Sequence, residues 1–193
     1  MSDNMRESEK MELINDKWEI EIIEIQYNPK SADNTVNPDS YISICEDYSK
    51  HLLLSVSDVA HSVEKSIVLS VSFYTPHSDF AFIDDERIFL FLNDVAVIFN
   101  LQTCEVDKKV CLSISGTLFS VYTYQDDFIL YCEMDIIRMN RNLDVLWDCS
   151  ARDIFVRFHG DEPAFEMDID RIKLYDFSDY YYEIDYDGKI IRD

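Results

Sequence analysis

Short stretches in which apolar and polar residues alternate dominate this chain. The clearest is Trp18–Tyr27, WEIEIIEIQY, where apolar residues beginning at Trp18 alternate with glutamates. Successive side chains of a strand point to opposite faces, so this pattern predicts a strand with one buried face. The alternation shifts phase at Ile22-Ile23, which predicts a β-bulge there.

The following segment, Asn28–Ser40, contains two Asn-Pro pairs and few residues that could be buried, which indicates a loop. From Tyr41 onward, runs rich in Ile, Val, Leu, Phe and Tyr are separated by Asp, Asn and Ser clusters at intervals of roughly eight to twelve residues. This spacing is typical of an all-β fold. Only Asp58–Lys65 and the extreme N-terminus have a pattern compatible with a helix, so we expect little helix.

Three windows of the sequence resemble one another, and they begin at Ile88, Phe128 and Ile172. Each has an apolar strand, a polar break, a second strand ending in Asn or Asp, a tight turn and a third strand. The residues that end the second strand are Asn100, Asn140 and Asp185. One further strand-like run precedes each window, at Phe80–Ile83, Leu118–Tyr124 and Ala164–Met167. Four strands in roughly 42 residues is the size of one β-propeller blade.

The segment Tyr182–Arg192, YEIDYDGKIIR, carries an aromatic strand, an Asp-Gly turn and an apolar return strand, and Ile136–Trp147 echoes it. These features resemble the outer hairpin of blades in propellers of the WD40 and pyrroloquinoline-quinone-enzyme type, over about residues 80–193. The resemblance implies antiparallel four-stranded blade-like repeats in a small or incomplete β-propeller. A β-sandwich or barrel is the alternative. We expect a polar N-terminal tail over 1–16 and a single all-β domain over 17–193, with repeat-like units near 41–79, 80–117, 118–160 and 161–193.

The net charge of the chain limits the classes of partner that it can bind. Its 193 residues include 39 Asp and Glu against 17 Lys and Arg, a formal net charge of −22, while 47% of the residues are hydrophobic. A chain of this hydrophobicity can fill a core, so the acidity belongs to a folded protein. Nucleic-acid affinity and docking on anionic membranes both depend on Lys and Arg, so we expect neither partner.

The three glycines, Gly116, Gly160 and Gly188, cannot form the glycine-rich motifs of dinucleotide sites, P-loops or hydrolase nucleophile elbows. The five cysteines show no C-x-x-C spacing, which favours reduced thiols in a cytoplasmic protein. The N-terminus has no signal-peptide pattern and no stretch reaches 18 apolar residues. No cofactor, metal or catalytic residue is expected.

Candidate binding residues lie near the C-terminus. Asp168 and Asp170 would share one face of a strand, as an acid/base or metal-binding pair requires, although the solvated side of an amphipathic strand is the better explanation. Glu183–Ile190 spaces its oxygens like the start of a calcium loop, but the repeat explains it as a hairpin turn. The turn-like His159 could join the carboxylates in a small hydrolase or lyase.

Tyr180 and Tyr182 would share one face of a strand, with Asp179 beside them. Exposed Tyr next to carboxylates could bind a sugar or a protein, because Tyr combines apolar area with a polar tip.

The high negative charge and the absence of an assembled catalytic motif favour a non-enzymatic protein-interaction module that binds a basic protein partner. An immunity or inhibitor protein is a specific form of this hypothesis, by analogy of size and charge. The alternatives are the hydrolase or lyase and the sugar-binding module. An incomplete propeller would also leave an open edge strand, through which a homodimer could form.

Overall fold

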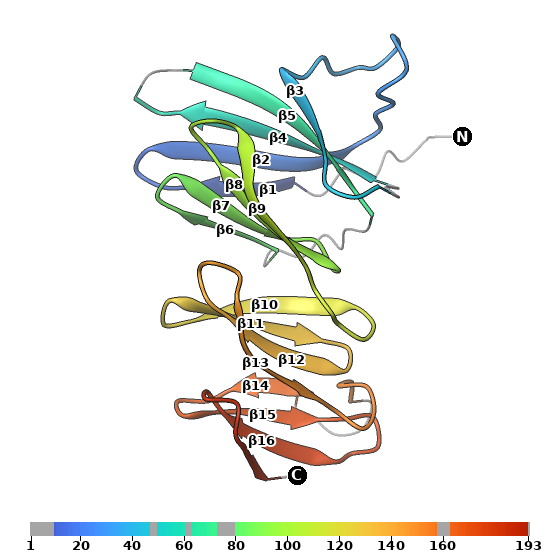
Figure 1. Cartoon of the computed structure of the whole chain (residues 1–193), viewed down its shortest axis with the longest axis vertical. Coiled ribbons are helices and arrows are strands. Elements are labelled where there is room, and N and C mark those ends of the chain that lie inside the picture. Colours follow the sequence, from blue (N-terminus) through green and yellow to red (C-terminus); the bar gives the residue numbers. More distant parts are fainter. Residues whose placement is uncertain (1–9, 47–49, 61–62, 73–79, 158–162, 193) are drawn as a thin grey trace, which may run out of the picture. The chain divides into compact units, whose positions relative to one another are not determined.

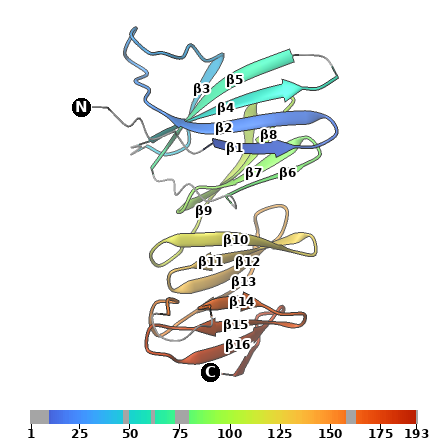
Figure 2. The same ribbon diagram turned by 180° about the vertical axis from the view of Figure 1, so that it is seen from behind.

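The computed structural model describes residues 10–46, 50–60, 63–72, 80–157 and 163–192, which form strands joined by turns and loops. The chain divides into two compact units, Met1–Cys111 and Leu112–Asp193, where a single domain over 17–193 was expected. Figures 1 and 2 show the sheets of each unit from opposite sides. None of the described residues belongs to a helix that could cross a membrane.

The first unit opens with a five-stranded sheet in the order β1-β2-β4-β5-β3. Its strands are β1 (Lys10–Ile14), β2 (Trp18–Ile25), β3 (Ser40–Ser43), β4 (Lys50–Asp58) and β5 (Val63–Val71). Neighbouring strands are antiparallel except β3, which runs parallel to β5. The long loop after β2 carries the chain back along the sheet, because β2 and β3 run in the same direction and a tight hairpin joins only antiparallel strands.

The second sheet of this unit pairs its strands in chain order, and all pairs are antiparallel. The strands are β6 (Ala81–Asp84), β7 (Arg87–Phe91), β8 (Val95–Asn100) and β9 (Glu105–Cys111). One apolar core joins the two sheets, and its fully buried members include Ile20, Leu54, Leu69, Leu90 and Val97. Burial of such side chains supplies most of the stabilisation, at about 25 cal/mol per Å² of apolar surface.

The second unit has two four-stranded antiparallel sheets, each paired in chain order. The first has strands β10 (Leu118–Tyr124), β11 (Asp127–Cys132), β12 (Asp135–Met139) and β13 (Val145–Ser150). The second, called here the terminal sheet, has β14 (Phe165–Met167), β15 (Arg171–Tyr175), β16 (Tyr181–Asp185) and β17 (Ile190–Arg192). They share a core that includes Ile129, Ile136, Phe155, Ile172 and Ile184.

The three four-stranded sheets occupy the three predicted repeat units from 80 onward, and each predicted strand is present. The turn that follows Asn100, Asn140 or Asp185 in each repeat is capped by the side chain of that residue. The side chains of Asn140 and Asp185 each accept hydrogen bonds from the backbone N–H groups two and four residues further on, at 2.8–3.1 Å. Asn100 caps its turn in a related way. The third residue after the cap has a left-handed backbone, at Leu143 (φ 57°) and Gly188 (φ 83°).

Several predictions for the first unit are wrong. Lys10–Ile14 is strand β1, so this part of 1–16 is not a tail. The pairing of β2 with β4 continues without a register shift, so no bulge occurs at Ile22-Ile23. Asp58–Lys65 contains the end of β4 and the start of β5, and is not a helix. Strands β3 to β5 complete a five-stranded sheet with β1 and β2, so 41–79 is not a separate four-stranded unit.

The described residues form no closed barrel or propeller.

Candidate functional site

The side of the five-stranded sheet that faces away from its core carries four glutamates. The register places Glu12 of β1 directly opposite Glu21 of β2, and Glu19 of β2 and Glu64 of β5 each opposite Ser57 of β4. We call these four glutamates the acidic face. They belong to the predicted alternation of the N-terminal strands, yet sequence reasoning did not select them because their partners across the sheet could not be known.

Two carboxylates directly opposite each other on neighbouring strands repel. Lys10 relieves this repulsion, because its ammonium group pairs with both Glu12 (2.7 Å) and Glu21. Hydrogen bonds to the two carboxylates raise the pKa of Lys10 above its ordinary value, so this lysine stays charged. By the strand register, Lys10 is the only Lys or Arg that faces this side among the described residues of the five strands.

Glu19 and Glu64 are solvent-exposed and have no cation opposite them. Ser55 and Ser57 of β4 lie between the glutamates of β2 and β5, and Ser66 of β5 lies opposite Ser55, so the middle of the sheet offers short polar side chains. Among the described residues, the acidic face therefore carries four glutamate side chains and one lysine, and it includes the edge strand β1.

The terminal sheet has a different balance of negative and positive side chains. One row across its outer face reads Glu166, Lys173, Glu183 and Arg192, so negative and positive side chains alternate from strand to strand. Arg171 forms an ion pair with Glu183 at 2.9 Å, and Tyr181 donates a hydrogen bond to the same carboxylate at 2.7 Å. These donors lower the pKa of Glu183. The carboxylates of this face already have partners within the sheet.

Asp168 and Asp170 lie in the turn between β14 and β15, and the prediction that they share a strand face is wrong. Lys173 pairs with Asp168 at 2.8 Å, and Arg171 makes two hydrogen bonds to Asp170, at 2.9 and 2.8 Å. Each cation lowers the pKa of its carboxylate. Both residues therefore act as anchors of the turn, and they do not form a pair that is open to a metal or a substrate.

The structure also separates the two tyrosines predicted to share a face. Tyr182 is 5% exposed and packs in the core of the second unit, where its hydroxyl donates to the buried Asp176 at 2.8 Å. Tyr180 precedes β16 and is 49% exposed, with the Arg152 guanidinium 5.1 Å from its ring centroid. Asp179 occupies the left-handed position of the same turn. Of these three residues, Tyr180 and Asp179 are exposed, and Asp179 pairs with Arg157 at 3.5 Å.

His159 lies outside the described residues, so its proposed part in a catalytic site has no structural counterpart here. The calcium-like oxygens of Asp185 accept backbone hydrogen bonds within the hairpin turn, which agrees with the turn interpretation. Within the described ranges, no three His, Cys, Asp or Glu side chains gather closely enough to hold a metal ion.

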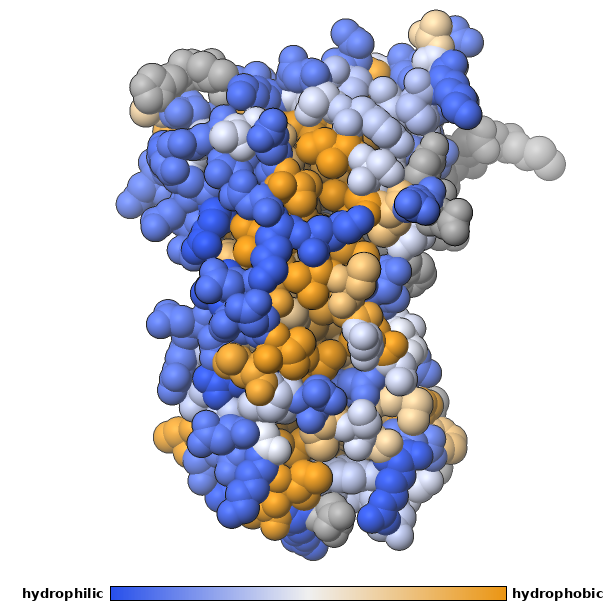
Figure 3. All heavy atoms as spheres, in the orientation of Figure 1, coloured by the Kyte–Doolittle hydropathy of each residue, from blue (hydrophilic) through white to orange (hydrophobic). Residues whose placement is uncertain are grey.

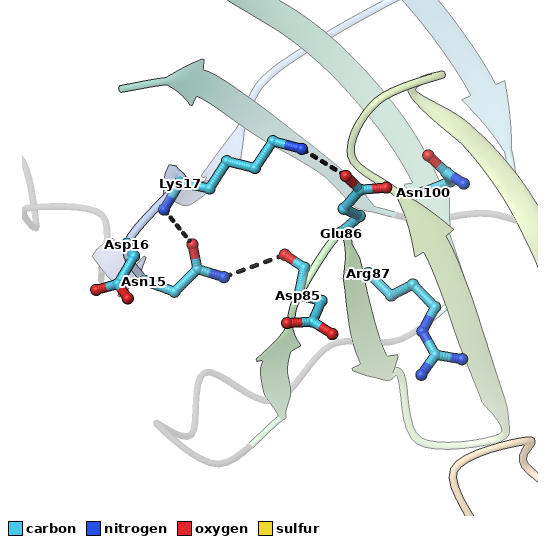
Figure 4. Close-up of a pocket in the computed structure, with 7 residues that line it drawn as sticks. All are labelled: Asn15, Asp16, Lys17, Asp85, Glu86, Arg87 and Asn100. Carbon is cyan, nitrogen blue, oxygen red and sulfur yellow. Dashed lines mark hydrogen bonds and ion pairs between the residues drawn. The ribbon is translucent and has the colours of Figure 1, made fainter. Parts of the chain in front are cut away.

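A polar pocket of about 660 Å³ lies in the first unit where the β1–β2 and β6–β7 turns meet (Figure 4). Asn15 joins the two turns, since its amide donates to the Asp85 carbonyl at 3.1 Å while its oxygen caps the β1–β2 turn. Lys17 also forms an ion pair with Glu86 across the same gap. The described residues that line the pocket are Asn15, Asp16, Lys17, Asp85, Glu86, Arg87 and Asn100.

Apolar side chains reach the surface of the second unit. Val145 and Leu146 of β13 and Ile190 and Ile191 of β17 are each about half-exposed. Patches of hydrophobic residues interrupt the polar surface in the view of Figure 3. Apolar atoms make up much of the surface of folded proteins, so these residues do not by themselves mark a binding site.

No protein-family model and no curated protein matches this sequence. Among solved structures, the chain is similar to Hsv2 from Kluyvelomyces marxianus, with 6% identity over 72% of this chain and a TM-score of 0.40. It is also similar to a protein of unknown function from Bacteroides caccae, with 16% identity over 77% of this chain and a TM-score of 0.37. The chain spans 46% and 64% of the lengths of these two proteins.

Proposed function

We propose that this chain is a non-enzymatic interaction module that binds a basic protein partner through the acidic face. The observation that supports this role is the imbalance on that face, where the described residues of the five strands place four glutamates, Glu12, Glu19, Glu21 and Glu64, and one cation, Lys10. Evenly solvated carboxylates would suffice for solubility. Glu12 and Glu21 share one lysine, while Glu19 and Glu64 lie opposite serine, so a cationic partner would add positive charge that this face lacks.

A basic partner would gain from this arrangement in two ways. Its Lys and Arg side chains would relieve the repulsion between neighbouring carboxylates, and the negative field would raise its association rate. Salt would weaken both effects, because charges further apart than about 8 Å are screened at physiological ionic strength. We therefore expect binding that falls steeply as salt is added.

Two variants with equal loss of charge test the location of the interface. The face variant carries Glu12→Gln, Glu19→Gln, Glu21→Gln and Glu64→Gln. The control variant carries Asp126→Asn, Asp148→Asn, Glu166→Gln and Asp187→Asn, which removes four exposed carboxylates of the second unit. Each protein is immobilised, exposed to native lysate at low salt and eluted with a salt gradient. The main basic protein retained by the unmodified chain is then titrated against all three proteins by calorimetry.

We expect the face variant to lose at least about tenfold in affinity, a loss of about 1.4 kcal/mol, while the control variant stays within a few-fold of the parent. Equal weakening in both variants would show that only net charge matters and would contradict a defined face. Retention of no basic protein, or a complex indifferent to salt, would remove the basis of the proposal.

Two finer assignments belong to the same proposal. The partner would be a basic toxin or enzyme if the chain is an immunity or inhibitor protein, and inhibition of the recovered partner would test this. The three four-stranded sheets would be blades of an incomplete propeller, which is supported by the recurring Asn or Asp cap of their turns. A homodimer through an open edge also stays a prediction, and β17, whose three residues are all exposed, is a suitable edge.

A further inference from the structure

Strand β1 is an edge strand, because it pairs with β2 on one side and with no described strand on the other (Figure 2). Along an antiparallel pair, residues whose backbone groups bond to the partner strand alternate with residues whose backbone groups point away. The Asn15 N–H donates to the Trp18 carbonyl at 3.0 Å, so Asn15 faces β2, and Leu13 two residues earlier does the same. The backbone N–H and C=O groups of Glu12 and Ile14 therefore point to the open side.

This open side is accessible among the described residues. Ile14 is 64% exposed, and the side chains of Lys10 and Glu12 are 45% and 58% exposed. No described backbone group bonds to the outward groups of Glu12 or Ile14. Edge strands are templates for a further strand unless a proline, a bulge or a covering element protects them. Strand β1 has no proline and no shift in its register, so it can accept another strand.

The two faces of β1 define the segment that fits beside it. Lys10, Glu12 and Ile14 lie on the exposed face, where the ammonium group of Lys10 is already paired with Glu12 at 2.7 Å. On the other face, Met11 is buried and Leu13 packs against the core. A cation opposite Glu12 gains attraction, and apolar side chains beside Met11 and Leu13 extend the core. The complementary segment therefore alternates basic and apolar residues.

A second copy of β1 does not have this chemistry. If two β1 strands paired antiparallel over their full length, Glu12 would lie directly opposite Glu12 of the other copy. Like charges in this position are destabilising. The edge therefore favours a different protein that supplies positive charge.

We propose that an extended segment of the basic partner adds to the open side of β1 as a sixth strand of the sheet. Backbone hydrogen bonds to Glu12 and Ile14 hold the segment, and its alternate Lys or Arg side chains lie over the acidic face. Main-chain bonds supply affinity in this mode of recognition, and the alternating side chains supply specificity. The inference rests on the proposed function, because it assumes that the acidic face binds a basic protein.

Peptides of equal charge separate strand addition from charge attraction. The probe is acetylated and amidated Ser-Val-Lys-Val-Lys-Val-Ser. Two further peptides carry methyl groups on the backbone nitrogens of both lysines, or on those of two valines. If the segment is antiparallel and its lysines lie over the acidic face, the lysine N–H groups bond to β1. If it is parallel, the valine N–H groups bond to β1 instead.

Each peptide is titrated at low salt into the ¹⁵N-labelled chain, and affinity and amide hydrogen exchange are followed by NMR. The unmethylated probe should slow the exchange of the Glu12 and Ile14 N–H groups, which point to solvent in the free chain. Only one methylated peptide should bind about tenfold or more weakly, because its hydrogen bonds to β1 are lost. The other should stay within about threefold of the probe, and its identity gives the direction of the added strand.

A substitution at the edge tests the same bonds without changing a charge. Ile14→Pro removes an outward N–H, and proline is tolerated in an edge strand where this group faces solvent. It should weaken binding of the probe by about fivefold or more. Ile14→Val keeps the N–H and should stay within about twofold of the parent. The methylated peptides decide the question even if Ile14→Pro fails to fold.

The proposal is overturned if the two methylated peptides bind alike, or if the probe leaves the exchange of Glu12 and Ile14 unchanged. It is also overturned if these N–H groups become protected when the concentration of the chain alone is raised, which would show that a second copy occupies the edge. In each case the face variant described above still reports on the proposed function. Its loss of affinity for the recovered partner would leave the acidic face as the interface and would refute strand addition alone.

Discussion

The hydroxyl of Tyr182 donates a 2.8 Å hydrogen bond to the carboxylate of Asp176, and both side chains are buried in the second unit. Asp176 is completely buried and also accepts hydrogen bonds from the backbone N–H groups of Ser178 and Tyr180. A buried carboxylate is tolerated only when such donors replace water. The pair therefore fixes the turn before β16 onto the core, and it makes Tyr182 a structural residue.

Removal of this phenol should destabilise the protein. Tyr182→Phe keeps the ring but leaves one oxygen of Asp176 without its donor, which should cost about 1–3 kcal/mol of unfolding free energy. Urea denaturation followed by circular dichroism measures the change. Tyr180→Phe is the matched control, since Tyr180 is half-exposed, and it should stay within about 0.5 kcal/mol of the parent. An equal effect of both substitutions would contradict the structural role.

Gly188 should not tolerate a side chain. It has a φ of +83°, and a Cβ built there would lie 2.5 Å from Cγ of Trp147. The indole N–H of Trp147 is bonded to the Tyr186 carbonyl at 2.8 Å, so the ring cannot move away freely. Gly188→Ala should lower the stability by more than about 1 kcal/mol, through backbone strain and this clash. Thermal unfolding with Trp fluorescence checks this, and an unchanged midpoint would refute the proposed contact.

Lys173 should control the titration of Asp168. Its hydrogen bond lowers the pKa of Asp168 below the ordinary value of 3.8, so this carboxylate stabilises the folded state above that pH. The contribution is lost as the pH falls through the lowered pKa. In Lys173→Gln the pKa of Asp168 should rise toward its ordinary value, as carboxyl NMR titration would show. Asp39, whose pKa is lowered by hydrogen bonds from Ser66 in the other unit, should titrate unchanged.

The cysteines should differ in reactivity. Cys132 is fully buried, and burial raises the pKa of its thiol to about 12, so it should resist alkylation in the folded protein. Cys111 is exposed and should be modified first. Iodoacetamide labelling at pH 8, followed by peptide mass spectrometry, gives the order, and urea should make Cys132 reactive. Labelling of Cys132 as fast as Cys111 without denaturant would contradict its burial.

The local pattern of the sequence determined most of the strands. Alternation predicted β2, and the repeat predicted the positions of twelve strands from β6 to β17, because each hairpin is specified by neighbouring residues. The repeat also marked Asn100, Asn140 and Asp185 as the ends of the second strands, and the structure shows that their side chains cap the turns that follow. The hairpin turn at Asp187-Gly188 was also recognisable, since left-handed backbone favours glycine.

The tertiary structure decided which charges and aromatic rings are available. Asp168 and Asp170 have the same chemistry as Glu19 and Glu64, yet the first two meet Lys173 and Arg171 while the last two face serine. Arg171 directly follows Asp170, but Lys173 reaches Asp168 from strand β15 and the serines come from β4, and such register depends on contacts that no local pattern contains. The sequence by itself therefore determined an acidic all-β chain with repeated hairpins. Only the fold decided which carboxylates are neutralised, which tyrosine is buried, and that the buried indole N–H of Trp18 has no acceptor among the described residues.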